Sequence, residues 1–299
     1  MDAESGIPIG GPAAAIETPS GKGAADENFP VGSFLIARRL RPHVATFYAF
    51  ARAIDDIADN PELAPEEKCR RLDAFAAAVR GDPDAPEIPK ARAMRASLEE
   101  TGVPVRHCLD LISAFKQDAV KNRYESWAEL IDYCDRSAAP VGRYLLDLHG
   151  ESRDLWPAND ALCNSLQVIN HLQDCGDDYR RLDRVYLPLE WMREAGADVA
   201  MLGRPAAPEP LKAVIRRCAA GAAALNERAE ALPLGLASPR LAAESAVILA
   251  LAKRLVRELM RRDPLAERVV LARPQSVATG LAALVRLIFR RPRAGARGR

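Results

Sequence analysis

The sequence has little excess charge of either sign. Its 42 Lys and Arg residues nearly balance 41 Asp and Glu residues, and the formal net charge is +1. Proteins that bind nucleic acid through a basic surface usually carry a clear positive excess. The composition therefore argues against a nucleic-acid partner.

The sequence also has few cysteines, and their spacing matches neither a metal site nor a disulfide framework. No pair shows C-x-x-C spacing, and no His lies at zinc-finger distance. Scattered cysteines of this kind are typical of reduced thiols that pack in the core of a cytoplasmic protein. The six are Cys69, Cys108, Cys134, Cys163, Cys175 and Cys218.

Long hydrophobic runs are missing as well. The longest, from Ser245 to Ala252, is much shorter than the roughly 20 residues that span a bilayer. Residues 1–27 combine no basic segment with an apolar run, so they do not resemble a secretory signal. We expect a disordered Gly/Pro/Ala-rich tail there and a basic tail at 291–299.

Two interpretations remain open for the apolar stretch Leu281 to Phe289, which precedes the Arg-rich tail. It is typical of a segment that rests on an anionic membrane surface. It equally fits a core helix followed by a solvated tail.

Apolar residues recur with a helical period along the chain, and no useful strand-like alternation or fixed-period repeat is present. We therefore predict an all-α, single-domain fold over 28–290. The predicted helices include a segment with Arg38 to Arg41 that is broken by Pro42, the helix after it, and the ranges 66–79, 91–100, 105–120, 127–150, 159–177, 211–231, 239–262 and 274–289. The 127–150 helix is expected to be interrupted near Pro140 and Gly142.

The stretch from Asn164 to Asp178 places polar residues on one helix face. Gln167, Asn170, Asp174 and Asp178 are spaced three, four and four apart. Asp174 and Asp178 at i,i+4 repel each other by roughly 0.2–0.5 kcal/mol. A cation is expected to compensate this repulsion.

A second acidic stretch, far upstream, has the same property. Asp55 and Asp56 lie four and three residues before Asp59, among apolar neighbours. Arg52 has the right spacing to pair with Asp56, so a solvated, self-paired face is the alternative interpretation. Two such stretches favour a metal–diphosphate site, because oxygen ligands suit Mg²⁺, with Mn²⁺ as the alternative ion.

These two motifs resemble those of the squalene/phytoene synthase family, over roughly Asn28 to Phe289. They are Asp55-Asp56-Ile-Ala-Asp59 and Gln167-x-x-Asn170-x-x-x-Asp174-x-x-x-Asp178. The resemblance implies the terpenoid-synthase helical bundle, with a central cavity and two aspartate motifs on opposed helices that hold Mg²⁺ against a prenyl diphosphate.

The resemblance also implies roles for individual residues. Metal ligands would be Asp55, Asp56, Asp59, Asn170, Asp174 and Asp178, and the catalytic set would be Asp55, Asp59, Asp174, Asp178 and Tyr48. Substrate-binding residues would be Arg52, Arg184, Gln167 and Asn170. For Arg180 and Arg181, just past the acidic face, the simpler explanation is a favourable interaction with the negative helix end.

Three departures from the common family pattern resemble a bacterial hopanoid branch of the family. They are Glu27-Asn-Phe-Pro-Val31, Gln173 before Asp174, and Ser137-Ala-Ala-Pro-Val-Gly142. In that branch presqualene diphosphate, made by a sister synthase, is ionised, rearranged and captured by water to give hydroxysqualene, without NADPH. On this resemblance we expect an enzyme that acts in the cytoplasm or peripherally at the inner face of the membrane, with the sister synthase as a candidate partner.

Two alternatives remain open. Both aspartate motifs are equally compatible with a synthase that condenses two farnesyl diphosphates into presqualene diphosphate, squalene or a carotenoid precursor. A non-catalytic relative, acting in assembly or lipid binding, would be expected to have lost the aspartates, which are intact here.

Overall fold

The computed structural model describes residues 36–290, and within this range the regular secondary structure is helical, without any strand. The two tails predicted at 1–27 and 291–299, and the departure at 27–31, lie outside the described residues. Among the described residues, Arg123 and Val185 form an isolated parallel bridge. The all-α prediction is confirmed.

Tertiary contacts divide the chain into two compact units. The described part of the first unit is 42–120, and that of the second is 36–41 together with 121–290.

The first unit consists of helices that pack through aromatic and polar contacts. Phe50 and Phe75 join α1 to α2 edge to face, with ring centroids 5.9 Å apart. His43 Nδ1 of α1 lies 2.8 Å from Ser97 Oγ of α3. The helices are α1 (Arg41–Ala58), α2 (Pro65–Arg80), α3 (Pro89–Thr101) and α4 (Arg106–Val120).

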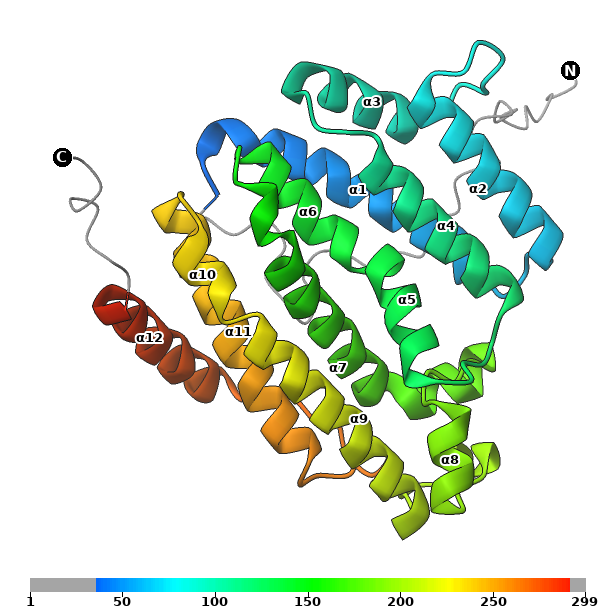
Figure 1. Cartoon of the computed structure of the whole chain (residues 1–299). Coiled ribbons are helices and arrows are strands. Elements are labelled where there is room, and N and C mark those ends of the chain that lie inside the picture. The colour runs from blue at the N-terminus through cyan, green and yellow to red at the C-terminus, as the bar shows by residue number, and fades with distance from the viewer. Residues whose placement is uncertain (1–35, 291–299) are drawn as a thin grey trace, which may run out of the picture. The chain divides into compact units, whose positions relative to one another are not determined.

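The second unit is organised around α7 (Trp156–Leu182), which packs against α5, α6, α9 and α11 (Figure 1). The last helix, α12, lies along α11. The other helices are α5 (Trp127–Ser137), α6 (Ala139–Leu148), α8 (Leu189–Ala195), α9 (Glu209–Arg228), α10 (Ala231–Gly235), α11 (Pro239–Leu259) and α12 (Arg273–Arg290), with short 3₁₀ turns η2 (Arg38–Leu40), η3 (Arg153–Leu155) and η4 (Val199–Gly203).

Local sequence explains where several helices begin. Pro65, Pro89 and Pro239 lie in first turns, where a missing backbone N–H costs nothing. Ser238 caps α11 by accepting from the Leu241 N–H. The buried carboxylate of Glu151 accepts from the N–H groups of Ala237 and Ser238, both at 2.7 Å, and so holds the chain that enters α11.

The structure differs from the predicted helices at several points. Pro42 does not break a helix, because it lies in the first turn of α1. The interruption predicted near Pro140 and Gly142 is present slightly earlier, because α5 ends and α6 begins at Ala138, with Pro140 in the first turn of α6. Helix α7 runs on past Asp177 to Leu182, and the short helices α8 and α10 were not predicted.

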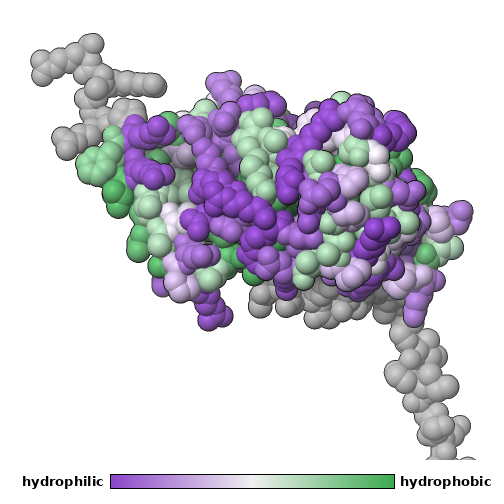
Figure 2. Space-filling model, turned by 90° about the horizontal axis from the view of Figure 1, so that it is seen from below, coloured by the Kyte–Doolittle hydropathy of each residue, from purple (hydrophilic) through white to green (hydrophobic). Residues whose placement is uncertain are grey.

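Among the described residues, no helix combines the length and the apolar character needed to cross a bilayer. Figure 2 shows hydrophilic and hydrophobic residues interspersed on one face of the molecule.

Candidate functional site

One face of α1 carries four of the predicted site residues. Tyr48, Arg52, Asp55 and Asp59 follow one another at intervals of four, three and four residues, and all are half-buried. Asp59 follows the last helical residue but keeps the helical turn, because its N–H donates to the Asp55 carbonyl at 2.9 Å. The helix thus aligns an aromatic ring, a guanidinium group and two carboxylates.

Arg52 makes ion pairs with the carboxylates of its own helix. Its guanidinium nitrogens lie 3.0 Å from Asp55 Oδ2 and 2.9 Å from the buried Asp56. The self-pairing that the spacing allowed is therefore present. A single guanidinium does not neutralise all three carboxylates of Asp55, Asp56 and Asp59.

Asp55 lies in an environment that disfavours its charged form. Although 30 % of the side chain is exposed, burial and then the nearby carboxylate of Asp59 raise the pKa of Asp55 well above its usual range. Asp56 and Asp118 raise it further, whereas Arg52 lowers it.

Asp118 was missed in the sequence, although a signal for it exists. It lies on the buried face of α4, four residues after Ala114 and seven after Leu111, and it is 4 % exposed. A carboxylate at a core position of an amphipathic helix requires compensation. Because the charge of Asp118 raises the pKa of Asp55, Asp118 belongs with the acidic residues of the first unit.

The second acidic face lies on α7 as predicted. Gln167, Asn170, Asp174 and Asp178 are all half-buried, while Val168, Ile169 and Leu172 between them are buried in the core. Asp177, next to Asp178, points to solvent and pairs with Arg180. The helix therefore has a half-buried polar face, which carries the four predicted residues, and a separate exposed face with Asp177.

The C-terminal end of α7 positions Arg184. Asp183 adopts a left-handed conformation with φ +51°, and the Arg184 N–H returns to the Asp178 carbonyl at 3.2 Å. Arg123 holds this turn by donating to the Asp183 carboxylate at 2.6 Å. Arg184 is consequently buried just beyond the acidic face, whereas Arg180 and Arg181 are exposed.

An aromatic cluster beside α7 was also missed in the sequence. His171 stacks on Tyr186 with ring centroids 3.6 Å apart, and Tyr133 and Tyr124 pack against Tyr186 at 5.7 and 5.5 Å. Burial, and secondarily the charge of Arg184, lowers the pKa of His171 to about 3, so the imidazole is neutral. Gln167 Nε2 lies 3.3 Å from His171 Nε2.

Two of the departures from the family pattern have packing roles. Gln173 is buried and donates to the carbonyl of Val269, which ties α7 to the segment before α12. Gly142 packs against α7 so closely that an added Cβ would lie 2.1 Å from Asn159 Oδ1.

The donor set of each face fits a hard divalent cation. Carboxylate and amide oxygens are the ligands of Mg²⁺, and the buried, like-charged cluster around Asp55 is the kind of environment that such an ion relieves. Within the described residues, no group of three His, Cys, Asp or Glu side chains is placed to hold a metal by itself. Mg²⁺ commonly takes one or two carboxylates together with substrate phosphates and water.

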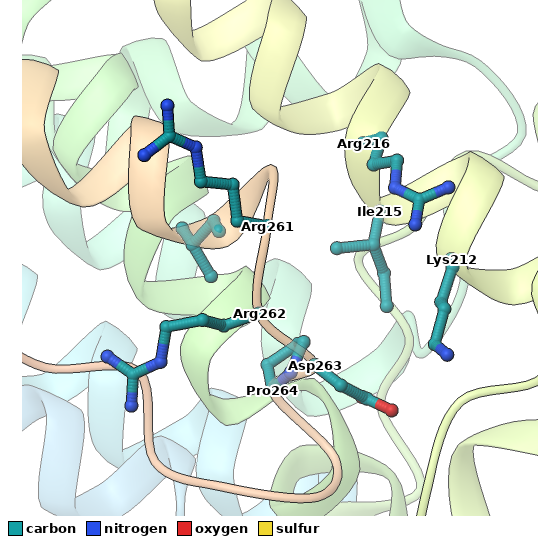
Figure 3. Close-up of a pocket in the computed structure, with 8 residues that line it drawn as sticks. Lys212, Ile215, Arg216, Arg261, Arg262, Asp263 and Pro264 are labelled. Carbon is teal, nitrogen blue, oxygen red and sulfur yellow. The ribbon is translucent and has the colours of Figure 1, made fainter.

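A pocket in the second unit lies apart from these residues. Its volume is about 90 Å³, and it is lined by Lys212 and Arg216 of α9 and by Arg261, Arg262 and Asp263 after α11 (Figure 3). None of the predicted site residues lines it.

The chain matches the family model for squalene/phytoene synthase over residues 23–275. It therefore belongs to the squalene/phytoene synthase family, as its motifs implied. A squalene synthase from Alicyclobacillus acidocaldarius has a similar structure, with a TM-score of 0.68 and 30% identity, over 77% of this chain and 87% of that one. The helical fold is thus that of the terpenoid synthases.

Within the family, the chain is similar to hydroxysqualene synthases. It is 46% identical to the one from Zymomonas mobilis over 84% of both chains. It is 45% identical to that from Rhodopseudomonas palustris over 93% of this chain and 94% of the relative.

Proposed function

We propose that this chain converts presqualene diphosphate to hydroxysqualene, as a carbon–oxygen lyase that requires Mg²⁺ and consumes no NADPH. The observation that carries the proposal is the 45–46% identity to hydroxysqualene synthases over most of both chains. The C–O bond to diphosphate breaks and the leaving group keeps the electron pair. Water then forms a new C–O bond to the rearranged cation and loses a proton.

The two acidic faces supply the residues for the first step. Bound Mg²⁺ would act as a Lewis acid toward the leaving diphosphate. Asp55, Asp56 and Asp59 on one face, and Asn170, Asp174 and Asp178 on the other, would be its ligands. Gln167, Arg52 and Arg184 would bind substrate, the two arginines by bidentate contact with diphosphate oxygens.

The remaining step requires protection of the cation. Tyr48, on the same face as Arg52 and Asp55, would present its ring to the positive charge, an interaction of about 0.5–2 kcal/mol. The site would also have to exclude all water except the reacting molecule. We place the reaction in the cytoplasm, with substrate delivered by a sister synthase at the inner membrane face.

Product analysis tests the proposal. Purified protein with Mg²⁺ is given presqualene diphosphate or farnesyl diphosphate in separate tubes, without NADPH. We expect hydroxysqualene from the first tube and no product from the second. Presqualene diphosphate formed in the second tube would instead identify a condensing synthase.

A matched pair of variants tests the role of α7. Asp174→Asn should lower turnover of presqualene diphosphate by about 100-fold or more, because it removes a metal ligand. Asp177→Asn, three residues further along the helix but exposed and paired with Arg180, should retain activity. Equal activity in the two variants would contradict the assigned metal site.

A further inference from the structure

The outer face of α12 exposes large hydrophobic side chains along its whole length. Their spacing of four, four, three and one residues puts them on one side of the helix. They are Val277, Leu281, Val285, Ile288 and Phe289, which are 62, 60, 52, 75 and 85 % exposed. We call these five residues the α12 outer face.

The opposite side of α12 is already used for packing. Gly280, Ala283 and Leu287 are buried, and the helix contacts α11 and α10. A surface helix of a globular protein normally carries polar residues on its outer side. This helix is apolar on both sides, so its outer face is suited to a second apolar environment.

Charge around this helix is strongly one-sided. From residue 268 to residue 299 the sequence contains eight arginines and no Asp, Glu or Lys. Since the whole chain has a net charge of +1, the other 267 residues carry −7. Arg286 and Arg290 lie on the exposed side of the helix beside its apolar residues.

We propose that the α12 outer face docks on the surface of an anionic phospholipid bilayer. The apolar side chains would enter the boundary between headgroups and acyl chains, and the arginines would meet the lipid phosphates. Because its inner side packs on α11, the helix would lie in the plane of the surface. A second copy of the chain is disfavoured as the occupant, since it would bring the same eight arginines against this face.

This inference goes beyond the proposed reaction and stands without it. Membrane docking depends on the exposed apolar residues and the arginines at the C-terminal end of the chain, and not on which substrate the protein converts.

Vesicle flotation tests the proposal. Full-length protein is mixed with vesicles of phosphatidylglycerol and phosphatidylethanolamine, or of phosphatidylcholine alone. We expect the protein to float with the anionic vesicles and at least about tenfold less with the neutral ones. The double variant Leu281→Glu/Ile288→Glu should lose most of this binding, because it puts carboxylates into the apolar face.

A matched control is available on another helix. Val120 at the end of α4 is 68 % exposed, comparable to Leu281 and Ile288, but lies outside α12. Val120→Glu should bind vesicles as the unaltered protein does. Turnover of detergent-dispersed substrate should be the same in the double variant, which separates a docking defect from loss of the reaction.

Three results would overturn the proposal. The first is that the unaltered protein does not float with anionic vesicles, and the second is that the double variant floats as well as the unaltered protein. The third is that sedimentation velocity shows a dimer of the unaltered protein and a monomer of the double variant, which would make a second copy the occupant of the α12 outer face.

Discussion

Single residues set how closely α6 and α7 approach, and Gly142 is the clearest case. A Cβ at this position would lie 2.1 Å from Oδ1 of Asn159, which is itself buried. Gly142→Ala should therefore lower the free energy of unfolding by about 1–3 kcal/mol, measured by urea denaturation.

A glycine in α12 serves as the control for this change. A Cβ on Gly280 would lie 3.4 Å from Val247, close to ordinary contact. Gly280→Ala should leave stability unchanged or raise it by up to about 1 kcal/mol, because alanine is the better helix former. If the two variants unfolded at the same urea concentration, the close contact would not matter.

At the residue scale, the predicted core packing of the cysteines holds for four of the six, because Cys69 and Cys163 are half-buried. All six are free, and four of them are buried. Burial raises the pKa of the Cys108, Cys163 and Cys175 thiols to about 12. At pH 8 only about one in 10⁴ of these thiols is the reactive thiolate.

Thiol titration at pH 8 should therefore find at most one rapidly reacting cysteine in the native protein and six after unfolding. We assign the rapid one to Cys69, which is half-buried, because four of the other cysteines are buried and burial raises the pKa of the Cys163 thiol to about 12. Cys69→Ser should abolish the rapid phase. Three or more rapid thiols would contradict this packing.

At the scale of elements, the helices and the two polar faces followed from periodicity. Gln167 to Asp178 share one half-buried side of α7 because their spacing matches the helical turn. The packing of Tyr186 on His171 and the effect of Asp118 on Asp55 could not be read from one helix. Each depends on which helices pack together, and that information is spread over distant parts of the chain.

Burial of His171 should make the folded chain sensitive to acid. The pKa of His171 is about 3 in the folded chain, against about 6.5 when unfolded, so the unfolded state binds the proton more tightly. Its contribution to stability is present above pH 6.5 and is lost as pH falls toward 3. The loss is about 1.4 kcal/mol per pH unit below about pH 6.

Thermal or urea unfolding in EDTA, between pH 7 and pH 4, measures this effect. His171→Phe keeps a ring for stacking but binds no proton, so its stability should fall less steeply than that of the unaltered protein. Carboxylates common to both proteins cancel in the comparison. Parallel pH profiles would show that His171 does not limit acid stability.

At the scale of the whole molecule, the proposed ligands come from both units of the chain. Asp55 belongs to the first unit and Asp174 to the second. A ligand that binds only the folded protein raises stability by about 2.7 kcal/mol at 100 times its Kd, which corresponds to several degrees in Tm. Mg²⁺ with inorganic diphosphate should therefore raise Tm in a concentration-dependent way.

Single variants in each unit show which unit contributes to the rise in Tm. If both acidic faces take part in binding, Asp55→Asn and Asp174→Asn should each remove most of the Tm shift, while the exposed Asp177→Asn should keep it. A shift lost in Asp55→Asn but retained in Asp174→Asn would confine the ion–diphosphate complex to the first unit. Because removing a carboxylate also relieves repulsion, the Tm of each variant without ligand should equal or exceed that of the unaltered protein. The loss of the shift can then be attributed to binding rather than to a damaged fold.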